Sequence, residues 1–174
     1  MINVQDLTHE AYVSYMRQLA EEHYLIQHTD ENRRFFRINI EEFLDDQVNW
    51  EGDGPVMLLG SPTTAVAGVQ DNYVDALRCA FMILKKVKPG DYDAENAAIS
   101  DCKKIGWDII SRILKDATDD SVDDRLIKTF HPREVQAEKV GMALDSEYGY
   151  RFTFTLYDPL DLSYDEEKWI ANES

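Results

Sequence analysis

The sequence has few of the residues on which most reactive sites depend. Its 174 residues include two cysteines and four histidines. Cys79 and Cys102 form no CxxC pair and stand at no Cys/His ligand spacing, which argues against a zinc site and against thioredoxin-like chemistry. Both lie within apolar patterns, so we expect buried, reduced thiols rather than a disulfide.

The histidines are scattered along the chain. His9 and His23 fit one helical face, but four turns separate them, which is too far for them to share a metal. His9 also lacks the second histidine that a zinc-protease helix needs four residues later. His28 stands alone, and His131 directly precedes a proline. We therefore expect hydrogen-bonded or solvated histidines without a catalytic or ligating role.

Phosphate-binding and nucleophile motifs are missing too. "GSPTT" at 60–64 has a glycine and hydroxyl groups but lacks the Gly-Lys-Ser/Thr of a P-loop. There is no GxSxG elbow and no GxGxxG after a strand. The acidic run 116–124 lacks the glycine and the final glutamate of an EF-hand loop, so a solvated loop is the simpler interpretation and calcium binding there stays open. We predict that the protein is not an enzyme and needs no cofactor.

Positive charge is scarce. Eighteen Lys and Arg against 34 Asp and Glu give a net charge of −16. Such a surface repels nucleic acid and anionic membranes and favours basic protein surfaces or metal cations, although solubility alone would also explain it. Two small basic clusters, at 33–37 and 85–88, do not outweigh this background. We predict no direct nucleic-acid or membrane binding, and we retain the second cluster as a candidate contact with an acidic neighbouring copy.

Long apolar runs are also missing. The N-terminus has no basic region followed by an apolar stretch, so no secretory signal is expected. No stretch approaches the roughly 20 apolar residues needed to span a bilayer. We expect a cytoplasmic protein, in whatever cell makes it. The apolar share of 44% and the aromatic share of 11% are typical of a folded domain rather than a disordered chain.

Two helices are predicted from apolar spacing. Thr8 is a suitable N-cap, and apolar residues recur at helical spacing from Tyr12 to Leu19. A longer helix is predicted over 94–116, and its wide apolar stripe should cover a sheet face. The stripe consists of Ala98, Cys102, Ile105, Ile109, Ile110, Ile113 and Leu114.

Several strand patterns lie between these two predicted helices. Residues 36–40 alternate between apolar and polar, and "VMLLG" at 56–60 is a short apolar strand. Residues 61–72 fit a small-residue loop or an edge segment. Residues 73–87 fit a helix and a strand, and their β-favouring end tips the prediction toward a strand.

Three strand-like segments follow the long helix, at 125–130, 134–144 and 148–157. The turn "DSEYG" between the last two predicts an antiparallel hairpin. Helices and strands do not alternate regularly, so we predict an α+β fold: a mostly antiparallel sheet with an N-terminal helix and one long central helix packed on it. Residues 1–157 would form a single domain.

The remaining segment, 158–174, is an acidic and aromatic extension. Pro159 should stop strand pairing at Tyr157. Six acidic residues stand against Lys168 alone, and apolar residues are interleaved with them. Either the extension folds back and buries Trp169 in its own domain, or its aromatic residues anchor in a neighbouring subunit. The candidate interface residues are Tyr157, Leu160, Leu162, Tyr164, Trp169, Lys85, Lys86 and Lys88.

The order of elements resembles small virion proteins of tailed bacteriophages, in particular the tail-terminator and head–tail joining group. The resemblance spans most of the chain as a pattern: the N-terminal helix, "RRFFRINI", "VMLLG", "CAFMILKKVKPGDYD" running into "ISDCKKIGWDIISRILKDA", and the closing "VGMALDSEYGYRFTFTLYDPL". It implies a non-catalytic α+β subunit that forms rings on a tail tube or at the neck. Its partners would be further copies of itself and other tail or neck proteins, and its location the virion or a phage-like particle.

A second hypothesis follows from charge alone. An acidic inhibitor or immunity-type protein would block a basic protein target by electrostatic complementarity. It would bind its target one to one, with strong salt dependence, instead of forming rings.

Overall fold

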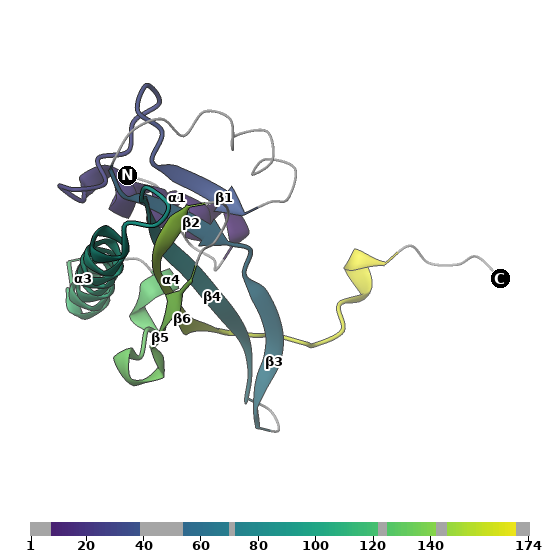
Figure 1. Cartoon of the computed structure of the whole chain (residues 1–174). Helices are drawn as coiled ribbons and strands as arrows, with labels where there is room; N and C mark the ends of the chain where they lie inside the picture. Colours follow the sequence, from purple (N-terminus) through teal and green to yellow (C-terminus); the bar gives the residue numbers. More distant parts are fainter. Residues whose placement is uncertain (1–7, 39–53, 70–71, 122–124, 142–145, 170–174) are drawn as a thin grey trace.

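The structure, a computed structural model, describes residues 8–38, 54–69, 72–121, 125–141 and 146–169. Within these ranges the chain forms a six-stranded, mostly antiparallel sheet, and the main core lies between helices and the sheet (Figure 1). This arrangement confirms the predicted α+β class, with an N-terminal helix and a long central helix against the sheet.

The sheet is organised around one long central strand. The strands are β1 (Phe35–Ile38), β2 (Val56–Gly60), β3 (Thr63–Val69), β4 (Asn72–Lys86), β5 (Gln136–Val140) and β6 (Glu147–Pro159). Their order is β1-β2-β4-β6-β5, with β3 also paired to β4. Only β1 and β2 run parallel among the described pairs. Because β6 follows β4 over almost its whole length, β2 and β3 share the other edge of β4, one at each end.

Two helices begin directly after residues whose side chains cap them. Helix α1 (His9–Glu22) starts after Thr8, whose hydroxyl accepts a hydrogen bond from the Ala11 N–H at 3.2 Å. Helix α3 (Tyr92–Thr118) starts after Asp91, whose carboxylate accepts from the Ala94 N–H at 3.0 Å. The predicted range of 94–116 is therefore two residues short at each end.

The core lies between these helices and one face of β4 and β6. Tyr12 and Met16 of α1 and Ile109 and Ile113 of α3 are completely or almost completely buried there. At the centre the rings of Phe81 and Phe152 stack, with centroids 5.2 Å apart and planes 8° from parallel. A second, smaller cluster includes Phe36, Val56, Leu58 and Leu84.

Gly106 lets α3 approach β6 closely. A Cβ atom on this residue would lie 1.9 Å from a ring carbon of Phe152. The neighbouring Trp107 meets the same ring edge to face, with centroids 5.2 Å apart. The absence of a side chain at Gly106 therefore sets the distance between the helix and the sheet.

The prediction for residues 125–130 is wrong. Residues Arg125–Lys128 form the short helix α4 rather than a strand. Ile127 and Phe130 are both buried, and the Phe130 N–H donates to the Ile127 carbonyl at 2.9 Å. Their spacing of three residues brings them to one side of a turn, which a strand would not do. A 3₁₀ turn, η1 (Pro132–Glu134), follows.

The other strand predictions are largely confirmed. Residues 73–86 of the ambiguous stretch 73–87 lie in a strand, since β4 covers Asn72–Lys86. Strand β3, at Thr63–Val69, confirms the edge-segment interpretation of 61–72. β5 and β6 pair antiparallel as predicted. The turn between them lies partly outside the described residues. Asn39 and Ile40 of the first predicted strand lie wholly outside them.

Strand β6 continues past its predicted end at Tyr157. Asp158 pairs with Asp75 and Pro159 with Val74. The Leu160 N–H then donates to the Tyr73 carbonyl at 2.9 Å. Proline is tolerated at a strand end, where its missing N–H costs no ladder bond.

Candidate assembly surface

The hairpin of β3 and β4 projects beyond the part of the sheet that the helices cover (Figure 1). The strands pair from Thr63 opposite Arg78 to Val69 opposite Asn72. Near the tip Gly68 has φ +98°, and a Cβ there would lie 2.1 Å from the Asn72 carbonyl oxygen. Glycine is therefore required for the strands to close in this way.

Strand β3 is exposed for nearly its whole length. Val66 and Val69 are 60% and 72% exposed, and only Ala67 is half-buried. Within the described part of the chain, no strand pairs with the other edge of β3. The strand carries no charged residue, whereas the opposite edge strand, β5, carries Glu138 and Lys139. Charge is a common protection of exposed sheet edges, and β3 has none.

The face of the hairpin directed away from the helices is apolar in its middle, between the Thr63–Arg78 pair at one end and Asn72 at the other. Leu77 belongs to the helix-side core, so its neighbour Ala76 points to the other face. Residues paired across two strands lie on the same face of the sheet, so further small apolar side chains lie on the face of Ala76. These are Ala65, Ala67 and Val69 of β3 and Val74 of β4.

The acidic C-terminal segment leaves the body of the protein beside this hairpin (Figure 1). Leu160 is half-buried, but Leu162, Tyr164 and Trp169 are 57%, 72% and 66% exposed. The rings of Tyr164 and Trp169 stack on each other, with centroids 6.0 Å apart, around the turn η2 (Glu166–Lys168). In the described structure the segment therefore does not bury Trp169 in its own domain.

Tyr157, in contrast, is engaged within its own domain. Its side chain is half-buried, and its hydroxyl donates to Glu134 Oε2 at 2.9 Å. This hydrogen bond, with partial burial, raises the pKa of Tyr157 above its ordinary value. Its backbone N–H donates to the Thr129 hydroxyl at 2.8 Å. The residue fixes the end of β6 from which the segment departs.

The predicted lysine contacts lie elsewhere. Lys85 and Lys86 are half-buried at the far end of β4, and Lys88 is exposed just beyond it. Lys85 Nζ lies 4.0 Å from Asp101 Oδ2 on α3. Twelve extended residues, roughly 40 Å, separate Lys85 from Tyr73, where the C-terminal segment starts. The structure thus divides the predicted interface between opposite ends of one strand.

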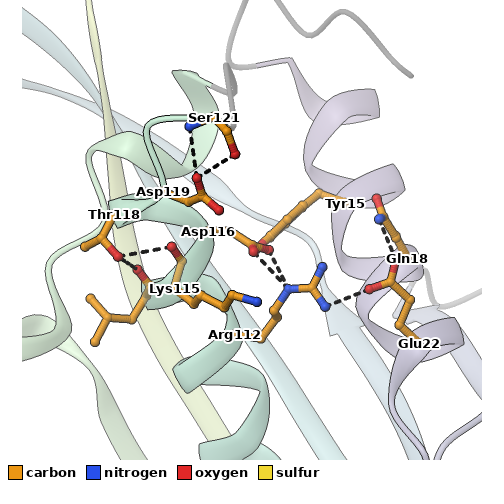
Figure 2. A network of polar contacts seen from close by, with 10 residues as sticks. Tyr15, Gln18, Glu22, Arg112, Lys115, Asp116, Thr118, Asp119 and Ser121 are labelled. Atoms are coloured by element: carbon orange, nitrogen blue, oxygen red, sulfur yellow. Dashed lines mark hydrogen bonds and ion pairs between the residues drawn. The ribbon is translucent and has the colours of Figure 1, made fainter.

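A partly buried polar network joins α1 to α3 (Figure 2). Arg112 Nε donates to both carboxylate oxygens of Asp116 at 2.9 Å, and Tyr15 donates to Asp116 at 3.0 Å. Arg112 also donates to Glu22 at 2.7 Å, and Gln18 donates to the other Glu22 oxygen at 2.7 Å. The Gln18 bond, aided by Arg112, lowers the pKa of Glu22. Donors and carboxylates are matched, so the network serves to hold the helices together.

The thiols confirm the expectation of buried, unpaired cysteines. Burial raises the pKa of Cys79 and of Cys102 to about 12, so neither is a nucleophile near neutral pH. Among the described residues no group of three or more His, Cys, Asp or Glu is placed to hold a metal ion. No described helix is long and apolar enough to cross a bilayer.

The acidic run is described only up to residue 121. There the hydroxyl and the N–H of Ser121 both donate to Asp119, which lowers the pKa of Asp119. Residues 122–124, which the calcium question also concerns, lie outside the described residues.

Comparison of the sequence with known proteins gave no match. The chain matches none of the protein-family models searched, and the search of curated proteins gave no match.

Proposed function

We propose that this chain is a non-enzymatic structural subunit of a phage or phage-like tail or neck assembly, which associates with copies of itself into a ring. The observation that carries the proposal is the exposed aromatic pair Tyr164 and Trp169, on a segment that packs little against its own domain. Large aromatic side chains with an acidic surround are typical anchors of protein interfaces.

The positions of the exposed elements support a head-to-tail contact. The C-terminal segment and the uncharged edge of β3 are different surfaces of the same chain. When one surface of a copy binds a different surface of the next, the contact is heterologous, and it generates a closed ring if the rotation closes. The α+β fold and the resemblance in element order agree with such a subunit.

Electron microscopy of the purified full chain at high concentration tests the proposal. We expect closed rings of uniform diameter built from copies of the 20.1 kDa chain. Particles that never exceed the size of one chain, also when a tail-tube protein is added, would contradict self-association and the tail assignment together.

The net charge of −16 favours one alternative, an acidic inhibitor or immunity-type protein that binds a basic target. This alternative needs no self-association. It requires a one-to-one complex whose affinity falls steeply as salt is added, because screening weakens attraction between unlike charges. Calorimetric titration against basic protein targets distinguishes it: tight, salt-sensitive binding by a monomer would favour the inhibitor over the ring subunit.

A further inference from the structure

The first residues of the C-terminal segment have a strand sequence without a sheet. From Leu160 to Asp165 apolar and polar residues alternate as Leu, Asp, Leu, Ser, Tyr, Asp. This period of two is typical of a strand with one apolar face. In the described structure, however, these residues form no strand, and Leu162 and Tyr164 are mostly exposed. Among the described residues, the apolar face of this pattern is therefore covered only at Leu160, which is half-buried.

Strand β3 presents the complementary situation, because no strand in the described part of the chain pairs with its outer edge. Its seven residues from Thr63 to Val69 match the six alternating residues in length. Backbone N–H and C=O groups along such an edge can accept one more strand, and added strands are a recurrent mode of peptide recognition. Because β3 carries no charge, an acidic segment meets no like charge on it.

We propose that residues 160–165 of one copy add as a strand to the free edge of β3 in a neighbouring copy. This inference rests on the proposed self-association and names the elements that carry it. Leu160, Leu162 and Tyr164 would lie on the side of Ala65, Ala67 and Val69, away from the helices. The intervening polar side chains would lie on the opposite side and remain in water.

The geometry favours a neighbouring copy over the same chain. Leu160 is held beside Tyr73 of β4, on the β6 side of that strand. A strand added outside β3 lies three strand spacings from β6, which is roughly 14 Å. Crossing that distance uses about four extended residues. Too few of the six would remain to pair along β3 of the same chain.

Pairing also requires a local rearrangement. In the isolated chain the Ser163 N–H donates to Asp161 Oδ1 at 2.8 Å, and this bond holds a turn that interrupts the extended pattern. The Ser163 hydroxyl, together with this backbone bond, lowers the pKa of Asp161. In an added strand, the Ser163 N–H would no longer donate to Asp161. It would pair with the backbone of β3 in the neighbouring copy, so one hydrogen bond replaces the other.

Mixed disulfide formation between two separate full-length variants tests the pairing. One variant carries Leu162→Cys, and the other carries a cysteine in place of Thr63, Ala65 or Ala67 in turn, so that an unknown register does not decide the outcome. The native thiols are buried and unreactive. Because each chain carries one new cysteine, a bond between the two variants joins different copies. Lys139→Cys on the charged edge strand β5 is the matched control.

We expect the Leu162→Cys chain to form a disulfide with at least one β3 variant, identified by peptide mass, and not with Lys139→Cys. Oligomers that form without any such bond would overturn the strand pairing and leave the ring proposal standing. A bond between two β3 cysteines alone, with none to residue 162, would also overturn it in favour of edge-to-edge pairing. Chains that remain monomeric in light scattering would contradict both proposals.

Discussion

At the scale of single residues, Trp169 is a large apolar side chain that its own domain leaves in water. A side chain of this size would contribute substantially to stability if it were buried, so its 66% exposure has an energetic cost. Tyr164 stacks on it and covers part of one ring face. In the proposed ring, a neighbouring copy covers the remaining surface.

Trp169→Ala should weaken self-association and leave the monomer intact. Loss of an interface aromatic typically costs 2 kcal/mol or more, which is about a 30-fold increase in dissociation constant. The free energy of unfolding should change by less than about 0.5 kcal/mol, because the residue is exposed. Sedimentation velocity and urea denaturation measure the two effects. Tyr24→Ala, at a residue 70% exposed beside α1, is the control and should alter neither. If Trp169→Ala instead unfolds the monomer, the segment belongs to its own core.

Asp116→Asn should destabilise the fold through the network of Figure 2. The substitution replaces a carboxylate that accepts from Arg112 and Tyr15 with an amide whose NH₂ faces a donor. Leaving these partly buried donors poorly paired should cost about 1–3 kcal/mol. Asp101→Asn, at an exposed residue on the same helix, should cost less than about 0.5 kcal/mol. Equal effects of the two changes in chemical denaturation would show that the network contributes nothing specific.

Stability should fall as the pH drops below about 6.5, in part because of His28. The ring is buried, and its Nδ1 accepts a hydrogen bond from the Arg34 N–H at 3.0 Å. Burial lowers the pKa of His28 from its ordinary value of 6.5. The unfolded chain therefore binds a proton first as the pH falls, and the contribution of His28 is complete above pH 6.5 and declines below it.

Denaturation of the wild type and of His28→Asn at pH 7.5 and 5.5 checks this expectation. The asparagine side-chain oxygen can accept the same hydrogen bond but does not titrate, so the variant should lose less stability over this range. Equal losses in both proteins would exclude a contribution from His28.

At the scale of elements, the sheet was predictable where one face is buried and ambiguous where both are. Along β6 buried residues alternate with less buried ones, and the strand prediction is confirmed. Along β4 Phe81 and Ile83 face the main core while Leu84 enters the second cluster. Apolar residues on both faces obscure the period of two, which is why this stretch also fitted a helix.

The candidate surface was only partly predictable for a similar reason. The aromatic C-terminal segment is evident from its composition. The free edge of β3 is not, because an edge is defined by strands that pair over long sequence distances. For the same reason the sequence could not place the lysines at the far end of β4, roughly 40 Å from that segment. Short segments such as α4 are decided by tertiary packing of a few side chains, which propensity does not record.

Gly106→Ala tests how closely α3 must approach β6. In an isolated helix this change is favourable by about 1 kcal/mol. Here the new methyl group would overlap the ring of Phe152, so we expect a net loss of about 1–3 kcal/mol in the free energy of unfolding. Gly141→Ala, where nothing lies within 4 Å, is the control and should be nearly neutral. A stabilised Gly106→Ala protein in thermal unfolding would mean that the helix and the sheet can separate without cost.

At the scale of the whole molecule, the charge opposes association and the exposed elements favour it. Copies that each carry −16 repel one another at long range. Salt screens this repulsion, with a Debye length near 10 Å at about 0.1 M, while apolar contacts and backbone pairing are little affected. Self-association should therefore strengthen as salt is added. Added salt would instead weaken the binding of a basic target, because that binding depends on attraction to the same negative charge.

The mass of the full chain in solution, measured by light scattering over a range of protein concentrations at low and moderate salt, tests directly whether the chain associates with copies of itself. We predict a mass that is a defined multiple of 20.1 kDa, reached at lower protein concentration when salt is higher. A mass of 20.1 kDa at every concentration and both salt levels would contradict it.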